Sequence, residues 1–99
     1  MPHVKHLKVM VVDDDRLILD QVEIVLNSIG VRSIHKFNRG EEAFKWLDDG
    51  NSVMVILLDL NMPDMDGIEV LRGLATRQFF GGIILFSGEN IRVLKTAQS

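Results

Sequence analysis

The chain has 99 residues, of which 46% are hydrophobic, and this is enough for one small packed domain and argues against disorder. Its 11 basic and 14 acidic residues give a net charge of −3, which offers no electrostatic basis for nucleic-acid binding. The absence of cysteine excludes disulfides and thiolate metal sites, and it fits a reducing compartment. No apolar run approaches the roughly 18 residues that a membrane span needs, so we expect no membrane partner.

The first half of the chain predicts two strand–helix units. The run LKVMVV at residues 7–12 predicts a buried strand, and the helix after it is expected to start near Asp15, a favourable N-cap residue. Apolar residues then recur at helical spacing as far as Ile29. Residues 31–37 predict a more polar strand at a sheet edge, and residues 41–49 predict a short helix.

The second half continues the same alternation. Residues 53–58 are the most apolar run and are expected to form the most central strand. A loop over 61–67, a helix over 68–75 and a fourth strand over 83–86 follow. A fourth helical pattern is carried by Ile91, Leu94 and Ala97. Strands that alternate with helices predict an α/β fold with a doubly wound parallel sheet.

Polar residues follow the predicted strands at their carboxyl ends, where open α/β sheets bind ligands. These residues are Asp13, Asp14 and Asp15, then Asp59, and then Ser87 and Gly88. If the first and third strands are neighbours, three of the acids converge and raise one another's pKa. A hard divalent cation such as Mg²⁺ relieves this repulsion through oxygen ligands. The alternative, that the acids only cap helices, fits Asp15 best.

A carboxylate beside Mg²⁺ can also act as a nucleophile toward phosphorus. Asp59 stands at the end of the most apolar predicted strand, where a charge needs a compensating partner. Ser87 ends the next strand and can donate a hydroxyl hydrogen bond to a phosphoryl oxygen. The sequence therefore predicts a site for phosphoryl transfer at this sheet edge.

Four stretches resemble the receiver domain of two-component response regulators: VMVVDDD, GEEAFKWL, VILLDLNMPDMDGIEVL and IILFSG. They span nearly the whole chain in the family's order and spacing, and LLDLNMPDMDG is the most specific. The resemblance implies a flavodoxin-like receiver fold with strand order 2-1-3-4. It also implies a cytoplasmic phosphoacceptor domain that depends on Mg²⁺ and is phosphorylated by a histidine kinase or a phosphotransfer protein. Such a domain catalyses only its own phosphotransfer and dephosphorylation, so we do not expect an enzyme.

The resemblance also assigns roles to single residues. Asp59 is then the phosphoacceptor, and Ser87 matches the residue that senses the phosphoryl group. Asp14 is the direct metal ligand, Asp59 is a metal ligand as well, Asp13 acts through a bound water, and the backbone carbonyl of Asn61 is the third protein ligand.

The chain departs from the family at its C-terminal end. The family has five strands and five helices, whereas this sequence is expected to be a single receiver domain over residues 1–99, truncated before the fifth βα unit. The switch aromatic of the fifth strand and the lysine after it then have no counterpart. We therefore expect the fourth strand to leave an unpaired edge, and a homodimer to form through that strand and a helix over Glu89–Gln98.

Two other functions fit parts of the pattern. A phosphorylation-independent interaction or dimerisation module with the same fold is favoured by the missing lysine. A haloacid-dehalogenase-type phosphohydrolase also uses an aspartate after an apolar strand, but it needs a second acid where this chain has Asn61.

Overall fold

The computed structural model describes residues 4–60, 67–87 and 90–95. A short 3-10 turn at Val4–His6 is followed by β1 (Lys8–Val12), α1 (Arg16–Ser28), β2 (Ser33–Phe37), α2 (Gly40–Asp48), β3 (Val55–Asp59), α3 (Gly67–Thr76), β4 (Gly82–Ser87) and β5 (Asn90–Lys95). The first four strands and the three helices were predicted from the sequence to within a few residues at each end.

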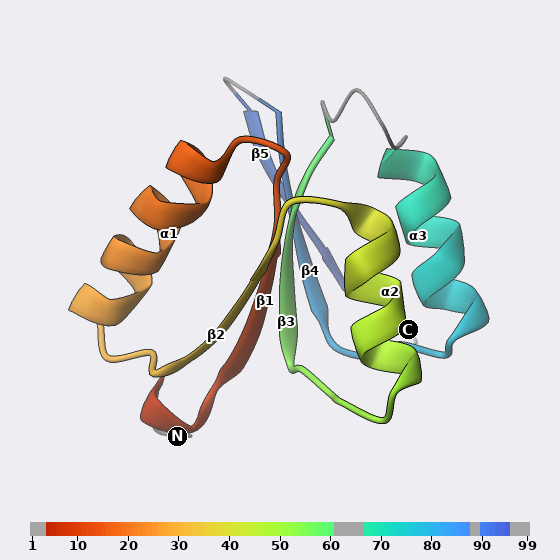
Figure 1. Ribbon diagram of the computed structural model, residues 1–99, viewed down its shortest axis with the longest axis horizontal. Coiled ribbons are helices and arrows are strands. Elements are labelled where there is room, and N and C mark those ends of the chain that lie inside the picture. Colours follow the sequence, from red (N-terminus) through yellow and green to blue (C-terminus); the bar gives the residue numbers. More distant parts are fainter. Residues whose placement is uncertain (1–3, 61–66, 88–89, 96–99) are drawn as a thin grey trace.

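The strands form one sheet in the order β2-β1-β3-β4-β5. The first four are parallel, which confirms the predicted α/β fold and the strand order 2-1-3-4. Figure 1 shows the sheet nearly edge-on, with α1 on one face and with α2 and α3 on the other. Among the helices of the described segments, none has the length and apolar character that crossing a bilayer requires.

The predicted fourth helix is wrong, because residues 90–95 form the strand β5. This strand runs antiparallel to β4 and pairs with it from Ser87↔Asn90 to Gly82↔Lys95. A six-residue run that contains β-branched residues is compatible with either structure, and pairing with a free sheet edge satisfies its backbone groups. Ile91 and Leu94 therefore belong to a strand, whereas Ala97 lies outside the described residues.

The expected unpaired edge of the fourth strand is also wrong, because β5 covers it along its whole length. The reason for expecting a dimer through that edge and a fourth helix is thereby removed.

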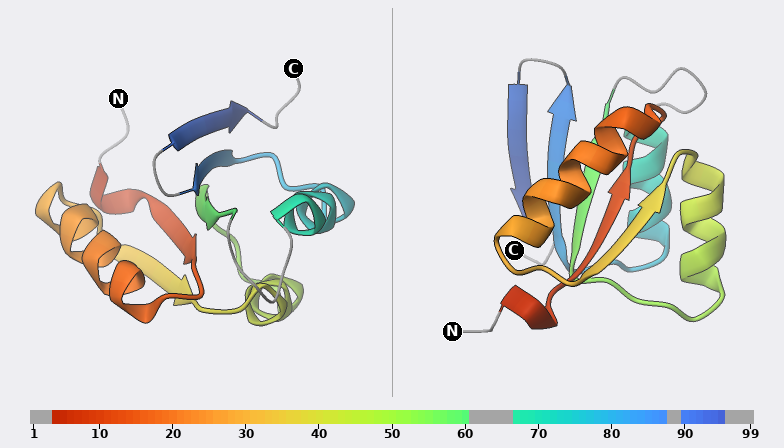
Figure 2. Two further views of the ribbon diagram at one scale, coloured as in Figure 1. Left: turned by 90° about the horizontal axis from the view of Figure 1, so that it is seen from above. Right: turned by 60° about the vertical axis from the view of Figure 1, so that its left-hand side comes forward.

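The two faces of the sheet are packed unequally. The face toward α2 and α3 holds the larger cluster of buried side chains, among them Met10, Val12, Ile56, Leu58 and Ile83. The face toward α1 has a smaller cluster, formed by Val9, Val11, Leu19 and Val31. Figure 2 shows the cause: α1 lies beside β1 and β2, so no helix of the described part covers β3 and β4 on that side.

The single tryptophan joins α2 to the edge strand β2. The ring of Trp46 lies 4.6 Å from that of His35 and 5.7 Å from that of Phe37, measured between ring centroids. The imidazole of His35 also forms a 3.1 Å hydrogen bond with the hydroxyl of Ser33. Aromatic contacts of this kind stabilise beyond the area they bury, so α2 is held over the polar edge of the sheet.

Candidate functional site

Three aspartates meet at the carboxyl edge of the sheet. Asp13 directly follows β1 and Asp59 ends β3, and these strands are parallel neighbours in which Val12 pairs with Leu58. The structure therefore places the ends of both strands side by side. Carboxylate oxygens of Asp13, Asp14 and Asp59 all lie within 4.8 Å of one another. The sequence predicted this convergence on the condition that the first and third strands are neighbours, and the pairing of β1 with β3 meets that condition.

The cluster is electrostatically unfavourable when it holds only negative charge. Asp13 is 2% exposed and Asp59 is 9% exposed, whereas Asp14 faces solvent. Burial is the main reason why the pKa of Asp13 is raised to about 6. The 2.9 Å hydrogen bond from the backbone N–H of Asp15 lowers this pKa, and the charges of Asp59 and Asp14 raise it. A cation bound between these oxygens would offset the repulsion among the carboxylates and favour their deprotonated form.

The donor set fits a hard divalent ion. All three groups offer carboxylate oxygens, which Mg²⁺ and Ca²⁺ prefer over nitrogen or sulfur. The exposed position of Asp14 leaves the site open to solvent, so water can complete the coordination of an ion such as Mg²⁺.

Asp15 has a structural role in the described site. It is the N-cap of α1, in an extended backbone conformation, and its carboxylate accepts a 2.9 Å hydrogen bond from the backbone N–H of Leu17. This confirms the predicted start of the first helix. It also gives Asp15 a role different from that of Asp13, Asp14 and Asp59.

Replacing Asp15 tests whether its capping role is independent of the acidic cluster. The Asp15→Ala variant is expected to lose about 1 kcal/mol of unfolding free energy, because an orphan N–H of the first helical turn loses its acceptor. Urea denaturation measures this loss. Any stabilisation of the protein by Mg²⁺ should persist in Asp15→Ala and disappear in Asp13→Ala, and an equal response of the two variants would contradict the assignment.

The other predicted site residues are only partly described. Ser87 ends β4, one residue beyond Phe86, which pairs with Asp59. A 2.9 Å hydrogen bond from the N–H of Leu60 to the carbonyl of Phe86 ties the two strand ends together. The backbone of Ser87 is thus at the same edge as Asp59, whereas its side chain, Asn61 and Gly88 lie outside what the structure describes.

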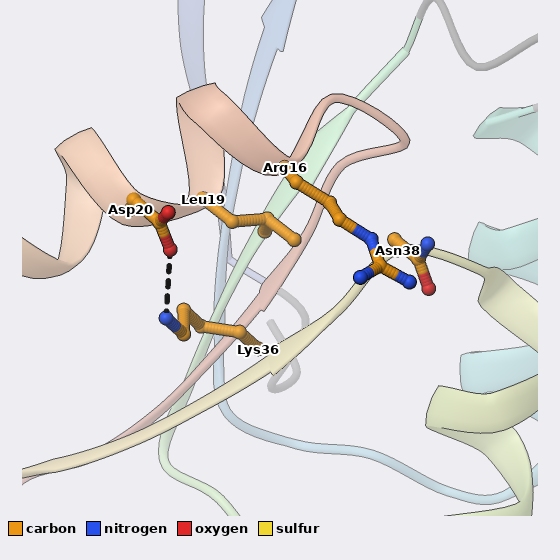
Figure 3. Close-up of a pocket in the computed structure, with 5 residues that line it drawn as sticks. All are labelled: Arg16, Leu19, Asp20, Lys36 and Asn38. Carbon is orange, nitrogen blue, oxygen red and sulfur yellow. Dashed lines mark hydrogen bonds and ion pairs between the residues drawn. The ribbon is translucent and has the colours of Figure 1, made fainter.

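A polar pocket of about 340 Å³ lies beside this edge, between α1 and β2. Figure 3 shows the side chain of Arg16 extending from α1 toward Asn38, and Lys36 reaching Asp20. Lys36 contacts Asp20 at 3.0 Å and Glu23 at 2.7 Å. Sequence reasoning did not single out Arg16 or Asn38. Their positions in the sequence could have indicated that they lie near the site. Asn38 directly follows the end of β2, and Arg16 directly follows the three aspartates.

Comparison with known proteins agrees with this fold and site. A family model described as the response regulator receiver domain matches residues 9–98, which is most of the chain. The protein therefore belongs to the response regulator receiver domain family. A relative is the cell cycle transcriptional regulator CtrA of Caulobacter vibrioides, which is 35% identical over 86 residues. The match covers 85% of this chain and 36% of CtrA, so the chain spans about a third of the length of that relative.

Solved structures show the same architecture. The response regulator protein TrrA of Thermotoga maritima, in complex with Mg²⁺ and BeF, superposes with a TM-score of 0.73 at 30% identity, over 84% of this chain and 70% of TrrA. The MaeR response regulator bound to beryllium trifluoride gives a TM-score of 0.74 at 26% identity, over 85% of this chain and 69% of MaeR.

Proposed function

We propose that this domain is a phosphoacceptor of two-component signalling, in which Asp59 receives a phosphoryl group from a histidine kinase or a phosphotransfer protein. The observation that carries the proposal is the cluster of three carboxylates at the end of β1 and β3. All three offer oxygens to an ion, and Asp59, which ends the buried strand β3 at the sheet edge, would also be the phosphoacceptor.

The chain's own residues have distinct tasks in this reaction. A carboxylate oxygen of Asp59 attacks the phosphorus of a phosphohistidine; the new P–O bond forms as the P–N bond breaks, and the bonding electron pair stays on the imidazole nitrogen. Asp14, Asp59 and the backbone carbonyl of Asn61 would hold Mg²⁺, with Asp13 acting through a bound water, and the bound ion would neutralise charge on the phosphoryl oxygens. The hydroxyl of Ser87 would donate a hydrogen bond to one of those oxygens.

Two neighbours support the role of the ion. TrrA is in complex with Mg²⁺ and BeF, and MaeR is bound to beryllium trifluoride. The oxygen-only donor set of Asp13, Asp14 and Asp59 suits the same hard cation. We further propose a cytoplasmic domain that is a switch rather than an enzyme, with phosphorylation changing an interaction surface near the end of β4.

A second candidate is an interaction module that works without phosphorylation. The five lysines of the given sequence are Lys5, Lys8, Lys36, Lys45 and Lys95, and none of them directly follows one of the four parallel strands. Lys36, for example, is paired with two acids of α1. Among the described residues, no lysine stands at the strand end beside Asp59, and this observation favours the second candidate.

Phosphorylation of the chain separates the two candidates. With a small acyl phosphate or a phosphohistidine donor and Mg²⁺, intact-mass spectrometry should show the addition of one phosphoryl group, and this should be lost in Asp59→Asn. Asp15→Asn is the matched control, because asparagine also caps a helix and this acid has no assigned chemistry. Absence of labelling with both donors would favour the interaction module, whereas labelling that survives in Asp59→Asn would place the acceptor elsewhere.

A further inference from the structure

The two helices on the larger face of the sheet are joined near their C-terminal ends by one arginine. Arg77 directly follows α3, and its guanidinium donates to both carboxylate oxygens of Asp48 in α2, at 2.7 Å from Nε and 2.9 Å from Nη2. A third hydrogen bond of 3.0 Å runs from Nη1 to the carbonyl of Gly73. A bidentate pair of this kind fixes direction as well as distance, which apolar packing does not.

An aromatic ring of α2 lies under this arginine. The guanidinium carbon of Arg77 is 4.3 Å from the centroid of the Phe44 ring, which adds a cation–π contact. The same ring lies against Gly73 of α3, at a point where a Cβ atom would overlap it. Arg77, Asp48, Phe44 and Gly73 therefore form one unit, which we call the α2–α3 clamp. It determines how α3 lies beside α2 on one face of the sheet (Figure 1).

The other end of α3 lies against the candidate site. Gly67, the first residue of α3, is buried, and a Cβ atom in its place would overlap the side chain of Leu60. Leu60 directly follows Asp59, and its N–H donates the 2.9 Å hydrogen bond to the carbonyl of Phe86. One end of α3 is therefore in contact with the residue after Asp59, whereas the other end is fixed to α2.

Helix α3 is short enough to connect its two ends rigidly. Its 10 residues span about 15 Å, at 1.5 Å per residue. Val70 and Leu74 are buried under it, but apolar contacts do not fix its direction by themselves. A helix of this length moves as one rigid element. A shift of its C-terminal end relative to α2 therefore also moves Gly67 and changes its contact with Leu60.

We infer that the α2–α3 clamp positions Asp59 through α3, with Arg77 as a positioning residue far from the acidic cluster. Asp48 holds Arg77, Arg77 fixes α3, and Gly67 supports Leu60 next to Asp59. The consequence for phosphorylation rests on the proposed function, because an aspartate whose main chain is held less firmly is less well oriented to attack phosphorus. The consequence for Leu60 does not depend on that proposal.

The clamp can be removed without opening the core. The side chain of Arg77 is 31% exposed and that of Asp48 is 54% exposed, so substitutions there leave no buried cavity. The hydrogen bonds from Arg77 lower the pKa of Asp48, so the pair stays charged near neutral pH. Neutral variants of either residue are therefore suitable tests.

Hydrogen–deuterium exchange of single amides, measured by NMR, tests the inference. Arg77→Gln should accelerate exchange of the Leu60 amide roughly fivefold, because the ion pair and the cation–π contact are lost. The amide of Asp13, which donates to the carbonyl of Phe37 at 3.1 Å on the β2 side of the cluster, should be unaffected. Arg72→Gln is the matched control, because Arg72 is exposed on α3 and its side chain has no ion pair among the described residues.

A variant of the partner residue separates the clamp from a general loss of stability. Asp48→Asn should accelerate Leu60 as Arg77→Gln does, and the double variant should add little, since both changes remove the same interaction. Equal acceleration at Leu60 and Asp13 would mean that the whole fold is loosened, and it overturns the inference. An unchanged Leu60 amide in Arg77→Gln overturns it as well.

The labelling reaction gives a second readout. At saturating Mg²⁺ and acyl phosphate, the rate at which the chain is phosphorylated should fall in Arg77→Gln and stay unchanged in Arg72→Gln. An unchanged rate in Arg77→Gln overturns the positioning role of this residue. If the wild type is not labelled at all, the proposed function fails, and the exchange of the Leu60 amide still decides whether the clamp acts through α3.

Discussion

The Leu58→Ala variant is expected to lose about 3–5 kcal/mol of unfolding free energy. Leu58 is 0% exposed and lies in the larger core cluster, one residue before Asp59. Its replacement removes buried apolar surface and leaves a cavity that the packed strands on either side cannot close. Because small domains are stable by only about 5–15 kcal/mol, this single change should remove a large share of the total. Urea denaturation followed by far-UV circular dichroism measures it.

Leu57→Ala is the matched control for this prediction. It makes the same chemical change at the adjacent position, but Leu57 faces the α1 side and is only partly buried. We expect a clearly smaller loss than for Leu58→Ala when both variants are measured under the same conditions. Equal losses would mean that the two faces of the sheet are packed alike, which contradicts the structure.

The ion-free protein is expected to lose stability as the pH rises from about 4 to about 6. The pKa of Asp13 is about 6 in the folded chain, against an ordinary value of 3.8. Between these values the folded state binds more protons than the unfolded state, so deprotonation favours unfolding. A difference of about two pKa units corresponds to roughly 3 kcal/mol. Denaturation curves across this pH range, in the presence of a chelator, test the prediction.

Two comparisons isolate the contribution of Asp13 from that of other carboxylates. Asp13→Asn should flatten this part of the pH profile and stabilise the ion-free protein above pH 6, because the amide oxygen can still accept from Asp15 without carrying charge. Adding Mg²⁺ to the wild type should reverse the loss, since the ion favours the deprotonated carboxylates. An unchanged profile in Asp13→Asn would show that another group titrates in this range.

The part of the structure that carries the site was predictable for a physical reason. Apolar runs at residues 7–12 and 53–58 had the length of buried strands, and α/β alternation forces such strands to run parallel. Once they are parallel, the residues that follow them must meet at one edge. This is why the sequence predicts that Asp13 and Asp59 lie together, once β1 and β3 are taken as neighbours.

The C-terminal part was not predictable by the same means. Ile91 and Leu94 are three residues apart, which suits a helix, but such a short run is decided by what lies next to it. The free edge of β4 offered backbone hydrogen-bonding partners, and this tertiary contact overrode the local spacing. The position of α1 over β1 and β2 was likewise invisible, because helical periodicity shows which residues are apolar but not which strands they cover.

The stacking of Trp46 on His35 determines what optical experiments on this protein can detect. Trp46 is the only tryptophan, and it contacts the edge strand β2 rather than the acidic cluster beyond β1 and β3. Its emission should therefore follow the detachment of α2 from β2. Ion binding at Asp13 and Asp59 would leave it nearly unchanged. Fluorescence is thus a probe of global unfolding here, and loading of the site requires a signal from another part of the molecule.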